Sequence, residues 1–228
     1  MNSFASPQTL SALPFPLPAE DLYSRVFDAI LEQRIHAASR FTEESLAQMF
    51  GARRSDIRGV LTQLSHQQII VLRANHRPRV AALDSEQTRQ MLHARRLAEI
   101  TLVRLACQSR LQDLKPLRNL IESERQCTAR GAAIRLSGEF HLRLAQMAGN
   151  APLAHFLGSL VPLTSLAIAQ FEVGLEGYCV WHKHQAILEA VERGEAVKAE
   201  NLLGQHLDHL EAMLLNAGPT LSQNRVTG

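Results

Sequence analysis

The sequence is poor in cysteine, in aromatic residues and in net charge. Its three cysteines, Cys107, Cys127 and Cys179, lie far apart and form no Cys-x-x-Cys pair, which argues against a disulfide framework or a zinc–thiolate site. Aromatic residues make up 5% of the chain, and the abundance of Leu, Ala, Gln, Arg and Glu favours helices over sheets. The formal net charge of +2 does not by itself indicate a nucleic-acid-binding protein.

Several kinds of functional segment are also missing. No apolar run is judged long enough to cross a bilayer, and the N-terminus lacks the basic region and cleavage signature of a signal peptide, so a cytoplasmic protein without a membrane partner is expected. The motifs H-E-x-x-H, E-x-x-H, G-x-S-x-G and the P-loop do not occur. The chain is therefore predicted not to be an enzyme. A metal-binding helical enzyme, or an adaptor whose basic face docks on an acidic protein, is kept as the alternative.

Composition along the chain predicts four regions. Residues 1–19 carry no charge and contain four prolines, which predicts an extended N-terminal arm. Residues 20–83 read as one small domain and residues 84–218 as a larger helical domain. Residues 219–228 are polar and are expected to form a flexible tail.

The second region has the pattern of a helix-turn-helix followed by a hairpin. Helical spacing covers residues 20–34, a second helix is predicted between Thr42 as N-cap and Gly51, and a third begins near Ser55. Residues 69–72 and 79–83 read as two strands of a wing. From Ser85 to about Ala217 the spacing predicts about six helices. The expected fold is mainly α, a winged helix-turn-helix with a small β wing joined to an all-α bundle.

Positive charge is concentrated around the third helix. Residues 53–79 contain six arginines against the single acid Asp56, a local charge of +5. Arg54 and Arg58 lie one turn apart opposite the apolar stripe, and Arg53 and Ser55 sit at the helix N-terminus. A recognition helix presents such residues to the major groove, where arginine can bind guanine O6 and N7 together or hold phosphate.

Residues 22–83 resemble the winged helix-turn-helix of GntR-type regulators. The resemblance is carried by Leu22, by residues 41–47 (FTEESLA), by residues 52–58 (ARRSDIR), and by a wing ending at residues 80–81. It implies that Arg54, Ser55 and Arg58 contact the major groove and that the wing tip, with His76 and Arg77, reaches the minor groove. The sequence departs from the family pattern in two places, where Asp56 replaces a proline and Arg77, followed by Pro78, replaces a glycine.

A second resemblance, to the C-terminal domain of the FadR-type (FCD) branch of that family, covers parts of the helical region. It rests on residues 140–141 and 149–150, on residues 184–191 (HQAILEAV), and on residues 206–207. It implies an effector-binding and dimerisation domain in which an Asp and three His often bind a divalent metal. His141, His184 and His206 match the histidines, but Ser137 stands at the position of the Asp.

Two roles remain open for the residues around this site. The histidines could hold zinc or nickel, or could bind an effector anion directly. Arg95 and Glu99 could form an ordinary i, i+4 salt bridge, whereas the resemblance implies that Arg95, with Asn150 nearby, binds an effector carboxylate. The sequence thus predicts a homodimeric, ligand-responsive transcription regulator, a repressor acting on a palindromic operator in double-stranded DNA, modulated by a small carboxylate.

Overall fold

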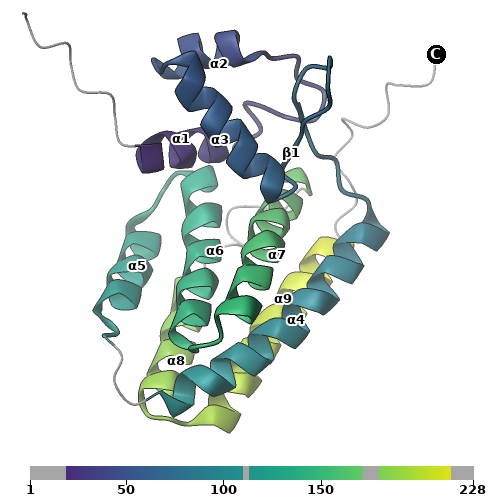
Figure 1. Ribbon diagram of the computed structural model, residues 1–228. Coiled ribbons are helices and arrows are strands. Elements are labelled where there is room, and N and C mark those ends of the chain that lie inside the picture. The colour runs from purple at the N-terminus through teal and green to yellow at the C-terminus, as the bar shows by residue number, and fades with distance from the viewer. Residues whose placement is uncertain (1–18, 110–112, 172–179, 217–228) are drawn as a thin grey trace, which may run out of the picture.

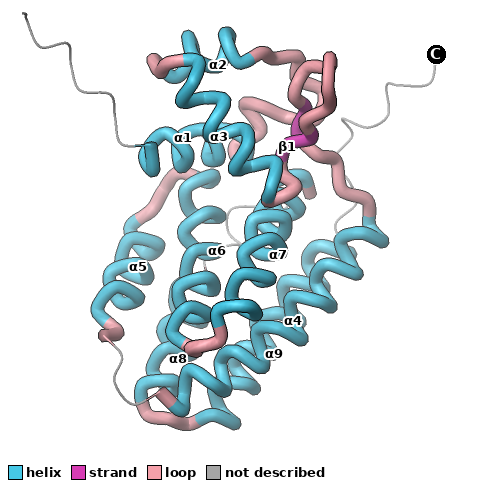
Figure 2. Tube along the Cα trace, in the orientation of Figure 1, coloured by secondary structure: helices cyan, strands magenta, loops and turns pink. Residues whose placement is uncertain are grey.

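The computed structural model describes residues 19–109, 113–171 and 180–216, and it places a small helical head on one end of a larger helical bundle (Figure 1). The predicted arm, apart from Ala19, the predicted tail and Cys179 lie outside the described residues. Helices dominate the described chain, and strands occur only in the head (Figure 2). The head consists of α1 (Ala19–Leu31), α2 (Glu43–Phe50), α3 (Arg54–His66), β1 (Ile70–Val71) and β2 (Arg79–Val80).

The helix-turn-helix forms where the sequence predicts it. The Thr42 side chain accepts a hydrogen bond from Ser45 N in a capping box, and Gly51 ends α2 with the left-handed angle φ 62°. The apolar stripe of α3 is buried in the core of the head, and it consists of Ile57, Val60, Leu61 and Leu64. Burial of this stripe turns the opposite, arginine-bearing side of α3 toward solvent.

The wing is shorter than predicted. β1 and β2 pair antiparallel over two residues each, with Ile70 opposite Val80 and Val71 opposite Arg79. The predicted four- and five-residue strands are therefore wrong in length. Leu72 is exposed beyond the paired residues, and the carbonyl of Ala81 and the N–H of Leu83 bond to the Gln170 side chain instead of continuing the pairing with β1. Asn75 has the positive φ of 60° in the turn, a conformation that Asn tolerates better than most residues.

Six helices follow in the described part of the chain, in agreement with the predicted number. They are α4 (Ser85–Gln108), α5 (Lys115–Gln126), α6 (Arg130–Met147), α7 (Ala151–Gln170), α8 (Trp181–Glu192) and α9 (Ala196–Asn216). In the bundle, α4 packs along α9 and α7, and α6 packs along α7 and α5. Asp84 caps α4 through a hydrogen bond from Gln87 N.

Helix α7 is long and apolar enough to cross a membrane by length and composition alone, which corrects the expectation that no such run exists. Half of the 18-residue stretch of α7 that meets this test is buried, and α7 contacts α4, α6 and α1. Residues 161–169 of α7 are all buried against the neighbouring helices, which accounts for the apolar composition of that half.

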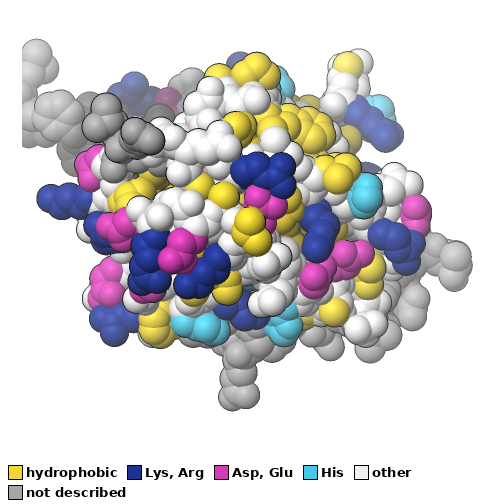
Figure 3. Space-filling model, turned by 90° about the horizontal axis from the view of Figure 1, so that it is seen from below, with side chains coloured by type: hydrophobic (Ala, Val, Ile, Leu, Met, Phe, Trp, Pro, Cys, Tyr) yellow, Lys and Arg dark blue, Asp and Glu magenta, His cyan; other side chains and the backbone are white. Residues whose placement is uncertain are grey.

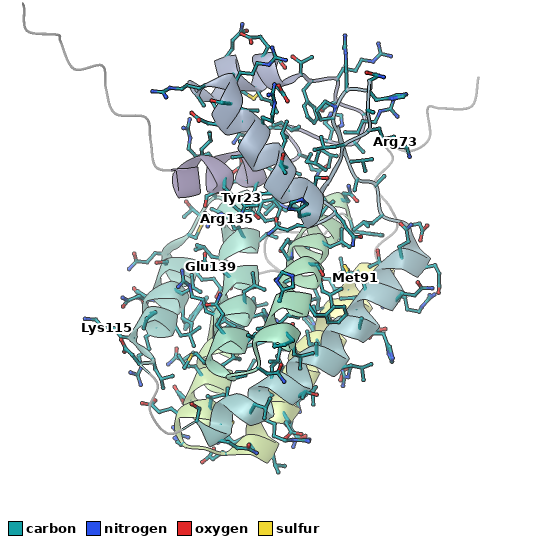
Figure 4. The ribbon with its side chains drawn as sticks, in the orientation of Figure 1. Tyr23, Arg73, Met91, Lys115, Arg135 and Glu139 are labelled. Atoms are coloured by element: carbon teal, nitrogen blue, oxygen red, sulfur yellow. The ribbon has the colours of Figure 1, made fainter. Side chains whose placement is uncertain are left out.

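The head and the bundle share one hydrophobic core. Phe27 of α1 belongs to the same buried cluster as Ile134 of α6 and Leu166 of α7. At the same junction the Arg135 guanidinium donates to both carboxylate oxygens of Asp28, at 2.7 and 3.1 Å. Figure 4 shows Arg135 and Tyr23 together where α1 meets the top of α6.

Backbone atoms also tie the head to the bundle. The Arg130 guanidinium donates to the carbonyls of Leu31 and Ile168, both at 3.3 Å. The Gln170 side chain of α7 accepts from Leu83 N at 3.2 Å and donates to Ala81 O at 2.5 Å. The orientation of the head is therefore set by direct contacts as well as by the chain connection.

The closest approach at the junction predicts a stability effect. A Cβ added at Gly131 would lie 2.6 Å from Asp28 O and 2.7 Å from Glu32 Cγ, so α1 must shift to accept any side chain there. We expect Gly131→Ala to lower the free energy of unfolding by about 1–3 kcal/mol, measured by urea denaturation.

Gly158→Ala is the matched control. A Cβ at Gly158 in α7 meets no atom within 4 Å, so this change should leave stability unchanged or raise it by up to about 1 kcal/mol. Equal effects of the two substitutions would contradict the close packing of α1 on α6.

Candidate functional site

Three buried histidines from three helices meet inside the bundle. His141 of α6, His184 of α8 and His206 of α9 each offer a ring nitrogen within 4.8 Å of the others. Their side chains are buried, and the Nε2 atoms of His206 and His141 are 3.3 Å apart. The structure thus brings together the three histidines that the sequence analysis grouped as metal ligands.

Two carboxylates orient two of the histidine rings by hydrogen bonds to their Nδ1 atoms. Glu99 Oε2 is 2.6 Å from His141 Nδ1, and Glu124 Oε2 is 2.8 Å from His184 Nδ1. Phe140 stacks on His184 with ring centroids 4.2 Å apart, which fixes the plane of that ring. A ring held at Nδ1 presents its Nε2 to the centre of the cluster, the orientation that a carboxylate gives to a metal-binding histidine.

Burial keeps the imidazoles neutral. It lowers the pKa of His141 to about 4 and that of His184 to about 3, and it holds the pKa of His206 well below its ordinary value. Neutral imidazole has a lone pair to offer to a cation or to a hydrogen-bond donor. Within the described chain, His184 Nε2 and His206 Nδ1 are buried without a hydrogen-bond partner.

The carboxylates differ in charge. Burial alone would raise the pKa of Glu99, but the charge of Arg95 and the contact with His141 lower it to about 2. Burial raises the pKa of Glu124 to about 8, so one proton lies between Glu124 and His184 at neutral pH. Because neutral His184 carries a ring proton as well, a cation at His184 Nε2 would displace one of the two protons and leave the other on Nδ1, which then donates to Glu124.

A small cavity adjoins the cluster. Its volume is ≈ 10 Å³, close to the minimum of about 10–15 Å³ that holds one water. Arg95, Ser137, His141 and His206 are among its lining residues. Arg95 is buried, is paired with Glu99 and lines the cavity. The sequence left a salt bridge and a place in the pocket as alternatives for Arg95, and the structure shows both.

The residues present fit a divalent cation. Three neutral imidazoles converge, two of them are oriented by carboxylates, and a buried nitrogen of His184 has no partner among the described residues. Ser137 lies one turn before His141 on α6 and lines the cavity, but its hydroxyl is a weaker ligand than a carboxylate. Water or a bound anion would complete the coordination.

Asn150 is not part of this cluster. Its side chain caps α7 by accepting a hydrogen bond from Leu153 N at 3.1 Å, and it does not line the cavity. Glu99 and Glu124 instead complete the site. The i, i+4 spacing from Arg95 pointed to Glu99, whereas no local pattern marked Glu124, which reaches His184 from 60 residues away along the chain.

A second candidate surface lies on α3. Arg54 and Arg58 are side by side there, with 61% and 62% of their side chains exposed. Both donate to Glu43 of α2, a residue for which the sequence predicts no contact with α3. Arg58 reaches it through two nitrogens, each at 2.9 Å, and Arg54 through Nε at 2.8 Å.

The other predicted DNA contacts are exposed around this pair. Arg53 is the N-cap of α3 and no side chain caps that helix, so its first backbone N–H groups remain open to an anion. Ser55 is exposed on the first turn, and His76 and Arg77 are exposed in the wing. The opposite end of the bundle differs, since basic and acidic side chains alternate on the face seen from below (Figure 3).

Solved structures share this fold over nearly their whole length. E. coli McbR/YncC superposes with a TM-score of 0.70 at 16% identity, covering 87% of this chain and 97% of that one. A transcriptional regulator described as GntR from Rhodococcus sp. RHA1 gives 0.69 at 17% identity, covering 88% and 98%. Lar from Listeria monocytogenes gives 0.54 at 17% identity, covering 90% and 99%. No curated protein matches at a significant level of sequence similarity.

The helical region also matches a sequence family. The profile of the FCD domain aligns with residues 90–209, more than half of the chain. The aligned range contains all three histidines together with Arg95, Glu99 and Glu124. Some members of this family bind metals through the domain. With the fold of GntR-type regulators throughout its described length, the chain belongs to the FCD domain family.

Proposed function

We propose that the protein is a ligand-responsive transcription regulator of the GntR type, in which the head binds double-stranded DNA and the FCD domain binds a small-molecule effector. The observation that carries the proposal is the pair Arg54 and Arg58, exposed together on the first turns of α3 in a winged helix-turn-helix. Each arginine keeps free N–H groups that can reach guanine O6 and N7 in the major groove. His76 and Arg77 of the wing supply contacts to phosphate or to the minor groove.

We further propose that the protein acts in the cytoplasm as a homodimer on a palindromic operator, and that it is a repressor. A single head of this size reads one short half-site. Two heads related by a two-fold axis read two half-sites, so protein symmetry favours a palindrome. Effector binding then changes the spacing of the heads and with it the affinity for the operator.

The FCD cavity supports an effector step that moves helices. At ≈ 10 Å³ it has room for one water-sized group, so an organic acid enters only if the lining helices separate. Arg95 supplies a buried guanidinium for a carboxylate, and a divalent cation at the histidines, when bound, would supply a further acceptor for the same group. A small carboxylate is therefore the effector class that we propose.

Helix α6 connects the cavity to the head. It carries Ser137 and His141 at the cavity, and two turns or less away it carries Arg135, which binds Asp28 of α1. Because Gly131 packs against the α1 backbone, a shift of this end of α6 toward the head would displace α1. The head would then respond to the effector through rigid packing.

DNA binding is tested by Arg58→Ala. We expect it to weaken specific binding by about 1–3 kcal/mol, measured by competition on DNA selected from a random pool or on the upstream region of the neighbouring genes. Arg118→Ala is the control, because Arg118 is a similarly exposed, acid-paired arginine on α5 of the bundle. Wild-type binding that is salt-sensitive but shows no sequence preference would favour the adaptor alternative.

Metal binding is tested by thermal unfolding of protein purified without a His tag or chelator. Zn²⁺ or Ni²⁺ at 100 times its dissociation constant should stabilise the protein by about 2.7 kcal/mol, and His184→Ala should remove this gain. His93→Ala is the control, since His93 is exposed on α4. If both variants respond to the metals as the wild type does, the histidine cluster is not the site.

Coupling between acid binding in the FCD domain and operator binding by the head is tested with Arg135→Gln. The wild type and this variant are each titrated with a panel of small mono- and dicarboxylic acids. An acid that binds should change operator affinity by a factor of about 5–150 in the wild type, and the factor should fall toward one in the variant, whose acid affinity is retained. Arg104→Gln, which removes a bidentate pair with Glu200 on the surface of the bundle, should keep the coupling. Full coupling in Arg135→Gln would place the signal path elsewhere.

A further inference from the structure

One acidic side chain lies in the middle of the proposed DNA-reading surface. Glu43 is the first residue of α2, and its carboxylate accepts three hydrogen bonds from α3. Glu43 Oε1 accepts Arg58 Nε at 2.9 Å, and Oε2 accepts Arg58 Nη2 at 2.9 Å and Arg54 Nε at 2.8 Å. Both oxygens are used, so Glu43 holds the two arginines at once.

The carboxylate itself is well fixed. The capping box at Thr42 fixes the backbone from which the Glu43 side chain extends. Hydrogen bonds from Arg58 and Arg54 lower the pKa of Glu43 to about 2, so it remains ionised at every pH near neutrality. Side-on contact through Nε and Nη2 fixes the plane of the Arg58 guanidinium and leaves its remaining N–H groups for another ligand.

Neither stability nor DNA affinity explains this arrangement. Exposed ion pairs contribute little to folding, and Arg54 and Arg58 are more than half exposed. A carboxylate facing DNA repels phosphate and cancels one of the two positive charges. Its presence reduces non-specific attraction, while the geometry it imposes is the kind that bidentate base recognition requires.

We propose that Glu43 is a positioning residue that determines sequence specificity by presenting Arg54 and Arg58 to base edges in the major groove. The ligand it selects is a half-site that offers guanine O6 and N7 to these two side chains. Without Glu43 the two arginine side chains become more mobile and the net positive charge of the surface rises. Both changes favour phosphate contacts, which carry no sequence information. The inference rests on the proposed DNA-binding function.

The test compares Glu43→Gln with Glu44→Gln on operator and non-operator DNA over a range of salt concentrations. Glu44 is the next residue of α2, is exposed, and has no ion pair within the described chain, so its replacement removes the same charge without releasing the arginines. For Glu43→Gln we expect the ratio of specific to non-specific affinity to fall about tenfold, with non-specific binding retained or strengthened. Glu44→Gln should keep the ratio.

Adding Glu43→Gln to a variant that lacks both arginines separates positioning of the arginines from a general loss of structure. Once Arg54 and Arg58 are both changed to Gln, Glu43→Gln should no longer alter the specificity ratio, and thermal unfolding should show all variants folded. A specificity ratio in Glu43→Gln equal to that of Glu44→Gln would overturn the proposal. Absence of sequence preference in the wild type would instead show that the proposed function is wrong.

Discussion

The packing of α1 on α6 is the contact on which the rest of the structure depends. Gly131 allows the two helices to approach until the carbonyl of Asp28 occupies the space of a side chain, and Arg135 closes the same contact through a paired carboxylate. Head and bundle therefore form a common core instead of two bodies on a linker. A rearrangement around His141, two turns along α6 from Arg135, must either be absorbed within the bundle or displace the head.

The interior of the bundle holds more polar chemistry than folding requires. Burying charged groups such as Arg95 and Glu99 is costly, and replacing such pairs by apolar residues is often neutral or stabilising. Here the pair is linked to His141 through the second oxygen of Glu99, so one chain of contacts runs from a guanidinium to an imidazole. The buried pair of Arg95 and Glu99 is explained by the groups that it places at the cavity, which are the neutral imidazole of His141 and the guanidinium of Arg95.

Local signals predicted the elements, and long-range packing decided the rest. Thr42 and Gly51 marked the ends of α2 because caps act within a few residues, and the resemblance located His141, His184 and His206. The wing strands were predicted too long, since β-branched residues reveal strand preference but not where the backbone stops pairing and bonds to another element, as Ala81 and Leu83 do to Gln170. Glu124 and Glu43 were missed as partners because their contacts depend on how separate helices meet. Asn150 was assigned to the pocket, but its side chain caps α7.

Both candidate sites use a carboxylate in the same way. Glu43 fixes the arginines of α3, and Glu99 fixes His141 while pairing with Arg95. In each case the acid reduces the local positive charge, so neither site attracts anions as strongly as its basic residues alone would. What it supplies is a fixed direction for each donor or lone pair, which lowers the cost of ordering when a ligand binds. A net charge of +2 is therefore compatible with the proposed DNA recognition, which would depend on oriented groups more than on total charge.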